Sequence, residues 1–274
     1  MGIAIRYLYC LLVIHIFSLV LIAQEPAIKE SALTFCSQNL FNFSSKDSKI
    51  SQSSQGLDLS SRFESQLCDL VALQEVIGND KKSATQTMEK LLRFINKNGR
   101  KYQYIISNGS DPRITLGYLY DSNKFEFVDS EELSGEMPKL NLVSRGRRYI
   151  RNPLMIKLRS NLYSKGSFYV LNFHFKSKFD GWKDHTKTNF ELSRMQMAEG
   201  IRQFFSEKLK KSDASDIFIM MGDRNTDQYA VSSKLLSGEL LMSDFIDKNG
   251  CRIANNLSAD CKVYPKNLKI FHPL

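Results

Sequence analysis

The segment Ile217-Phe218-Ile219-Met220-Met221-Gly222-Asp223-Arg224-Asn225 joins an apolar run to a short polar turn. The run predicts a buried β-strand with the polar residues at its end. Because side chains alternate along a strand, we expect Asp223 and Asn225 on the same side. A carboxylate there can orient or deprotonate a water, and an amide can donate to a phosphate oxygen. An Asx turn after a buried strand is the simpler explanation of this segment taken alone.

Three further polar segments follow strand-like runs: Ser37-Gln38-Asn39, Leu73-Gln74-Glu75 and Asn172-Phe173-His174. A carboxylate at the end of a buried strand, such as Glu75, is held rigidly and favours a cation. Mg²⁺ prefers oxygen ligands and keeps several waters, so one or two protein carboxylates suffice. Asn39 could add a carbonyl ligand or hold the carboxylate in place. A glutamate at a strand end is, on its own, commonly a surface residue.

His174 emerges at the end of an apolar run and precedes the polar segment Lys176-Ser177-Lys178. An imidazole at this position could protonate a leaving oxygen or donate to a non-bridging phosphate oxygen. The plainer interpretation is a structural histidine. Lys176 and Lys178 could contact phosphates, although lysines beyond a strand end are more often simply exposed.

The rest of the pattern predicts an α+β fold with two packed mixed β-sheets flanked by helices, a four-layer α/β/β/α sandwich. Helical patterns are expected around Met88–Ile95, after a Ser83/Gln86 capping box, and from Asn189 to Lys210. The second helix should bury Met195, Ala198, Ile201, Phe205 and Leu209. Eight strand-like runs occur at Leu33–Ser37, Leu70–Leu73, Tyr102–Ser107, Leu116–Tyr120, Phe125–Val128, Leu154–Leu158, Ser167–Phe173 and Ile217–Met221.

The N-terminus resembles a secretory signal peptide, with Arg6 followed by an apolar stretch and then small and polar residues. We expect a signal peptide at residues 1–23, a linker at 24–31 and one domain at 32–274. A secreted or periplasmic location follows, and an uncleaved N-terminal anchor is the alternative. The net charge of +9 favours a polyanionic partner, although a generically basic secreted protein would have the same charge.

Four cysteines follow the leader. Cys251 and Cys261 flank a polar, loop-like stretch and are the expected disulfide. Cys36 and Cys68 lie in or beside apolar strands and are expected as buried thiols. None has the spacing of a zinc site.

The order of the four polar segments, together with Arg151-Asn152-Pro153 before an apolar strand, resembles the endonuclease/exonuclease/phosphatase superfamily. The similarity is greatest to its secreted deoxyribonucleases of the pancreatic type and runs from about Thr34 to Ala230. It implies Mg²⁺, with Mn²⁺ or Ca²⁺ as alternatives. It also implies that Glu75 is a metal ligand, that Asn39 supports the metal site, and that Arg151 and Asn225 bind phosphate. His174 would act as an acid or as a hydrogen-bond donor to a phosphate oxygen. Asp223 and Asn225 would orient the water and the scissile phosphate.

The sequence departs from that family in two places. The family's C-terminal Ser-Asp-His motif is missing, and His272, preceded by Phe271, is a weak substitute. We therefore expect a domain that is incomplete at its C-terminal end, with a native short variant as the alternative. The loop Asp111-Pro112-Arg113 lacks the aromatic residue that the deoxyribonucleases carry, which weakens the case for their DNA groove contacts.

The resemblance implies a secreted Mg²⁺-dependent phosphodiesterase, with a nuclease acting on nucleic acid as the first hypothesis. A phospholipid or phosphoinositide phosphoesterase of the same fold is the alternative. A catalytically inactive basic binding protein is the second alternative, because the Asp-His pair is missing. We expect a monomer with no stable membrane association after signal cleavage.

Overall fold

The chain separates into a unit of Met1–Leu33 and a compact unit of Thr34–Leu274, which holds every element below. The computed structural model describes residues 32–41, 43, 68–78, 80–96, 100–109, 111–138, 147–179 and 190–240. The expected leader, the linker, Cys251, Cys261 and His272 lie outside these ranges. Within them, no helix combines the length and apolar character needed to cross a membrane.

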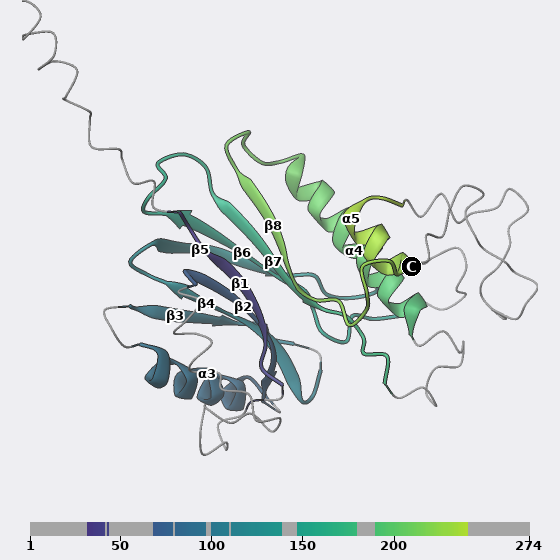
Figure 1. Ribbon diagram of the computed structural model, residues 1–274, viewed down its shortest axis with the longest axis horizontal. Coiled ribbons are helices and arrows are strands. Elements are labelled where there is room, and N and C mark those ends of the chain that lie inside the picture. Colours follow the sequence, from purple (N-terminus) through teal and green to yellow (C-terminus); the bar gives the residue numbers. More distant parts are fainter. Residues whose placement is uncertain are drawn as a thin grey trace, which may run out of the picture. The chain divides into compact units, whose positions relative to one another are not determined.

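Eight strands form two four-stranded sheets, with the orders β1-β2-β4-β3 and β5-β6-β7-β8 (Figure 1). Each sheet contains one parallel pair, β1 with β2 and β7 with β8, and its other pairs are antiparallel. The predicted pair of mixed sheets is therefore confirmed. The strands span Phe35–Asn39 (β1), Leu70–Ile77 (β2), Tyr102–Ile106 (β3), Ile114–Asp121 (β4), Phe125–Glu132 (β5), Leu154–Ser160 (β6), Phe168–His174 (β7) and Ile217–Asp223 (β8).

Helices cover the outer faces of both sheets, which gives the four layers that the sequence predicts (Figure 1). On the first sheet, Leu73 of β2 belongs to a buried apolar cluster with Met88 of α3. On the second sheet, Phe173 of β7 belongs to a cluster with Ile201 of α4 and residues of α5. The helices span Lys81–Ile95 (α3), Glu191–Leu209 (α4) and Val231–Ser237 (α5).

Side chains on the inner faces join the two sheets. Tyr118 of β4 is fully buried, and its hydroxyl donates to the carbonyl oxygens of Leu154 (2.9 Å) and Val170 (2.7 Å) in the second sheet. Because strand side chains alternate, β7 directs Phe173 towards α4 and its neighbours in sequence, Asn172 and His174, towards the first sheet. The site residues of both sheets therefore approach one another across the sandwich.

The helix predictions need two corrections. Helix α3 begins three residues earlier than the proposed Ser83/Gln86 box, because Asp80 is its N-cap and exchanges hydrogen bonds with Ser83. In α4, Met195, Ala198, Ile201 and Phe205 are buried as predicted. Leu209 is 52% exposed, so its prediction as a core residue was wrong. The residues after Phe205 are mostly exposed because the last turn of α4 extends beyond the apolar cluster.

The prediction of Cys36 and Cys68 as free buried thiols was wrong, because they form a disulfide. Strands β1 and β2 run parallel, with Cys36 opposite Val71, so the chain just before β2 lies beside the start of β1. The two Cα atoms are 5.9 Å apart, within the usual range for a disulfide. The bond ties together the starts of the two strands whose other ends carry site residues.

Candidate active site

Four strand ends meet at one edge of the sandwich. In the parallel pairs, Asn39 of β1 lies opposite Gln74 of β2, and His174 of β7 lies opposite Asp223 of β8. Parallel pairing places the carboxyl ends of neighbouring strands together. The sequence segments that end these strands therefore come together as predicted, although nothing in this arrangement alone assigns their roles.

Asn39 lies between two carboxylates. Its Nδ2 donates to Oε1 of Glu75 (3.0 Å) and to Oδ2 of Asp223 (2.9 Å). Its Oδ1 accepts a hydrogen bond from the backbone N–H of Phe41 (2.8 Å), which fixes the orientation of the amide. Asn39 thus holds a carboxylate from each sheet at a single point, the supporting role suggested by the sequence.

Two residues of the site have left-handed backbone conformations. Glu75 has φ 61° and lies within the register shift between Leu73 and Val76 in the pairing of β2 with β4, so it is part of a β-bulge. Asn225 has φ 50°, a conformation that asparagine tolerates, and its backbone N–H donates to Oδ1 of Asp223 (2.8 Å). The Asx turn considered for this segment is therefore present. It uses one oxygen of Asp223 and leaves the other beside Asn39.

His174 is buried and faces both carboxylates. Its Nε2 lies 3.7 Å from Oε1 of Glu75 and 3.7 Å from Oδ2 of Asp223, which is too long for a hydrogen bond. Its Nδ1 is buried and has no hydrogen-bond partner in the described part of the chain. Burial, reinforced by the positive charge of Arg151, lowers the pKa of His174 to about 3. The imidazole is therefore neutral at neutral pH and has one N–H to donate.

Arg151 and Asn225 share one acceptor. Arg151 Nη1 (3.2 Å) and Asn225 Nδ2 (2.9 Å) both donate to the carbonyl oxygen of Phe175, the residue after His174. Arg151 also pairs through Nε with Oδ2 of Asp111 (3.3 Å). The two predicted phosphate-binding groups therefore converge beside His174. Sequence reasoning missed Asp111, since its loop was read only for the absence of an aromatic residue.

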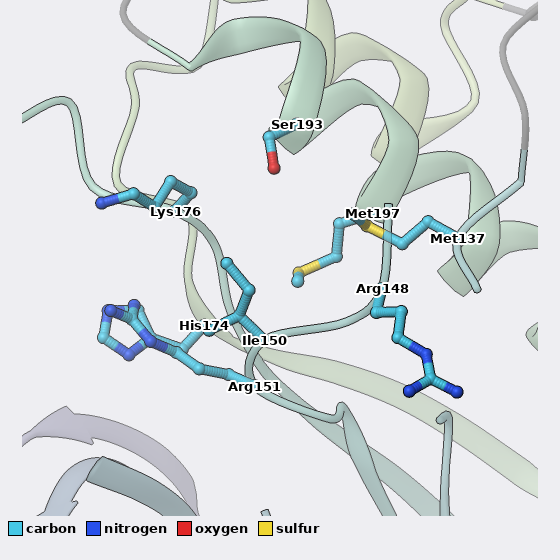
Figure 2. Close-up of a pocket in the computed structure, with 8 residues that line it drawn as sticks. All are labelled: Met137, Arg148, Ile150, Arg151, His174, Lys176, Ser193 and Met197. Carbon is cyan, nitrogen blue, oxygen red and sulfur yellow. The ribbon is translucent and has the colours of Figure 1, made fainter. Parts of the chain in front are cut away.

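A small pocket adjoins His174 on the side of α4 (Figure 2). Ser193 and Met197 reach it from α4, and Lys176 reaches it from the segment after β7. Its volume of about 20 Å³ is sufficient for a single water. A larger ligand therefore does not fit inside this pocket. Its lining consists of Met137, Arg148, Ile150, Arg151, His174, Lys176, Ser193 and Met197.

Lys176 and Lys178, the two lysines after His174, contact residues other than the two carboxylates. The ammonium group of Lys176 lies 4.5 Å from the centre of the Phe190 ring. Lys178 pairs with Asp227 at 3.6 Å, and both side chains are well exposed. The structure thus favours the interpretation of Lys178 as a surface residue.

The carboxylates of Glu75 and Asp223 fit a hard divalent cation. Within the described ranges, the only ion-pair partner of either one is His174, which is neutral, so their negative charge is not compensated by a cationic side chain. No group of three or more His, Cys, Asp or Glu side chains able to hold a metal occurs in the same ranges. Two partly exposed carboxylates suit Mg²⁺, which keeps several water ligands, better than they suit Zn²⁺, which prefers His and Cys ligands.

Comparisons with known proteins agree with this fold. No family model and no curated protein sequence matches the chain. Among solved structures, an endonuclease/exonuclease/phosphatase family protein from Bacteroides thetaiotaomicron has a TM-score of 0.50 and 16% identity, over 76% of this chain and 67% of that one. The mannosyl-6-phosphatase Bt3783 of B. thetaiotaomicron VPI-5482 has a TM-score of 0.50 and 15% identity, over 76% and 71%.

The human Nocturnin catalytic domain, solved with a bound sulfate, has a TM-score of 0.48 and 15% identity over 71% of this chain. The match spans 66% of the Nocturnin chain, so this chain corresponds to about two thirds of that structure. The two Bacteroides structures confirm the resemblance in the sequence at the level of the fold. This chain has the fold of the endonuclease/exonuclease/phosphatase proteins.

Proposed function

We propose that this chain is a Mg²⁺-dependent phosphodiesterase that hydrolyses nucleic acid. The observation that carries the proposal is the meeting of Glu75 and Asp223 on the Asn39 amide, with the imidazole of His174 3.7 Å from both carboxylates. Carboxylates without a cationic partner, beside a neutral N–H donor and an arginine, suit a phosphate ester and its metal ion.

Each residue then has a definite task. Glu75 and Asp223 would hold Mg²⁺, which when bound would offset the charge that develops on the phosphate. Arg151 and Asn225 would exchange their shared acceptor, the carbonyl of Phe175, for phosphate oxygens. His174 would donate its N–H to a non-bridging oxygen, a role that its neutral state favours over that of a general acid.

Asp223 has a further task in this proposal. His174 is the only histidine in the described ranges, and its neutral ring faces Glu75 and Asp223. Asp223 is therefore the group placed to orient the attacking water and accept its proton. The Asx turn supports this task because it fixes the orientation of the Asp223 carboxylate through Oδ1, while Oδ2 accepts a hydrogen bond from Asn39.

Nucleic acid is the substrate that the charge favours. A net charge of +9 concentrates polyanions near the protein through a field that salt screens. The neighbour named as a mannosyl-6-phosphatase acts, by its name, on a phosphate monoester, so the same fold also serves smaller substrates. We place nucleic acid first because binding a small phosphate monoester does not require so high a positive charge.

We further propose that the protein is exported as a monomer without stable membrane association. The basis is the apolar N-terminal stretch that resembles a signal peptide. The Cys36–Cys68 disulfide supports this location, because disulfides persist in oxidising compartments such as the periplasm and the cell exterior.

The proposed function can be tested by incubating the purified chain with supercoiled plasmid, single-stranded RNA or phosphoinositide vesicles, in Mg²⁺ or in EDTA. We expect metal-dependent cleavage of at least one nucleic acid and no release of phosphate from the vesicles. Salt-sensitive nucleic-acid binding without turnover would support an inactive binding protein instead. Turnover of the vesicles alone would support the lipid substrate.

A further inference from the structure

Two buried amide side chains, Gln74 and Asn172, link the sheets directly behind the candidate site. Gln74 is 1% exposed and Asn172 is fully buried. Nε2 of Gln74 donates to Oδ1 of Asn172 at 2.8 Å, across the interface between the sheets. Neither side chain takes part in the chemistry proposed above. A buried amide pair is retained only where its hydrogen bonds are satisfied, so its partners indicate what it does.

The pair lies at the β-bulge that carries Glu75. In the pairing of β2 with β4, Leu73 faces Gly117 and Val76 faces Thr115, so two β2 residues occupy the space opposite a single β4 residue. Glu75 is the second of the two and has φ 61°. A non-glycine residue in this conformation is strained and persists only where its surroundings enforce it.

Asn172 reaches across from the second sheet to both strands of this bulged pair. Its Nδ2 donates to the carbonyl oxygen of Leu73 at 2.8 Å and to that of Gly117 at 3.0 Å. One side chain thus holds β2 and β4 together at the point where their register changes. Gln74 is held in turn by Ser37, whose hydroxyl lies 3.1 Å from its Nε2.

Gln74 and Asn172 also fix how the end of β2 lies relative to the end of β7 at the site. Asn172 lies two residues before His174 on the same face of β7, and Gln74 directly precedes Glu75. We propose that Gln74 and Asn172 are positioning residues, which lock the bulge and thereby align the Glu75 carboxylate with His174. The inference rests on the proposed function insofar as Glu75 holds the metal ion.

The test compares Asn172→Leu with the matched control Tyr118→Phe. Leucine keeps the branching of asparagine at Cγ, although it is larger, and removes all of its hydrogen bonds. The Tyr118 hydroxyl is also buried and also joins the sheets, but it contacts Leu154 and Val170 instead of the bulge. Both variants should lower the melting temperature. Only Asn172→Leu should lower kcat and weaken Mg²⁺ binding, each by about 10- to 100-fold, with little change in KM.

Nucleic-acid cleavage gives kcat and KM, and calorimetric titration of the metal-free protein with Mg²⁺ gives the metal affinity. Equal losses of kcat and Mg²⁺ affinity in the two variants would overturn the inference, because the network would then only stabilise the fold. Should Asn172→Leu not fold, Gln74→Leu replaces it in the same comparison, because it removes the hydrogen bond that holds Asn172 against the bulge, and the same losses are expected.

A third readout separates this inference from the proposed function. If the wild-type protein neither cleaves nucleic acid nor binds Mg²⁺, the proposed function fails. Hydrogen exchange of the amides from Glu75 to Ile77 then decides the inference. Faster exchange in Asn172→Leu than in Tyr118→Phe, at equal distance from each melting temperature, supports a locked bulge. Equal exchange overturns it.

Discussion

Replacing Asn39 by leucine should destabilise the metal-free protein far more than the metal-bound one. The substitution removes the amide that donates to Glu75 at 3.0 Å and to Asp223 at 2.9 Å. The repulsion between the two carboxylates is present in the wild type and in the variant, so it favours a bound cation but does not add to the loss. The lost bonds to charged acceptors are each worth about 1.5–3 kcal/mol. Because both carboxylates are partly exposed, at 19% and 28%, we take the lower end.

We therefore expect Asn39→Leu to lower the free energy of unfolding by about 3 kcal/mol in EDTA. Saturating Mg²⁺ should restore at least half of this loss, because the ion compensates the same two carboxylates. Urea unfolding in EDTA and in Mg²⁺ measures both values. Asn161→Leu is the control, since among the described residues its side-chain amide donates to the carbonyl of Asn123 and not to a carboxylate, and its effect should not depend on metal. An Asn39→Leu loss that is equal with and without Mg²⁺ would show that the two carboxylates do not bind the ion together.

Three further predictions concern the surroundings of the site. Asp111→Asn removes the carboxylate that pairs with Arg151, so KM for a nucleic-acid substrate should fall several-fold, whereas Arg151→Gln should raise KM. Steady-state kinetics measures both values. An unchanged KM in both variants would show that Arg151 does not bind phosphate. Because the pKa of His174 falls from 6.5 in the unfolded chain to about 3 in the folded one, its contribution to stability is complete above pH 6.5 and is lost as the pH falls towards 3. Urea unfolding of the metal-free protein across this range should show a shallower loss in His174→Gln, and parallel curves would contradict the low pKa. The Cys36–Cys68 disulfide closes a loop of sequence separation 32, so its reduction should lower the free energy of unfolding by about 3.5 kcal/mol through chain entropy. A melting temperature that does not respond to reductant would show that the bond is absent in solution.

The apolar runs were sufficient to predict all eight strands of the described ranges, because each run has the length of a strand. The expectation that the Ile217–Met221 run is buried was wrong, since β8 lies at the edge of its sheet and Ile217 and Met220 are 48% and 40% exposed. Helix α5 was missed, since seven residues are too few to show a helical period before Gly238 ends the helix. The Asp80 cap was also missed, because the hydrogen-bond pattern of a capping box can be completed by several nearby polar residues.

The site residues could be identified from the sequence because they follow strands whose ends parallel pairing brings together, as with Asn39 and Glu75. Contacts that depend on the packing of one sheet against the other could not be predicted. The bond of Gln74 to Asn172, the pairing of Arg151 with Asp111 and the low pKa of His174 all arise from residues far apart in the sequence. The disulfide was missed for the same reason, since strand pairing decides which cysteines meet.

Glu75 and Asp223 are proposed to form a metal site that cleaves phosphodiesters. The most direct measurement is the cleavage rate of bis(4-nitrophenyl) phosphate against Mg²⁺ concentration, for the wild type and for Glu75→Gln. The glutamine variant should melt cooperatively, need at least 10-fold more Mg²⁺ for half-maximal rate, and reach a rate at least 100-fold lower. The same Mg²⁺ dependence and the same maximal rate in both proteins would exclude Glu75 from the metal site.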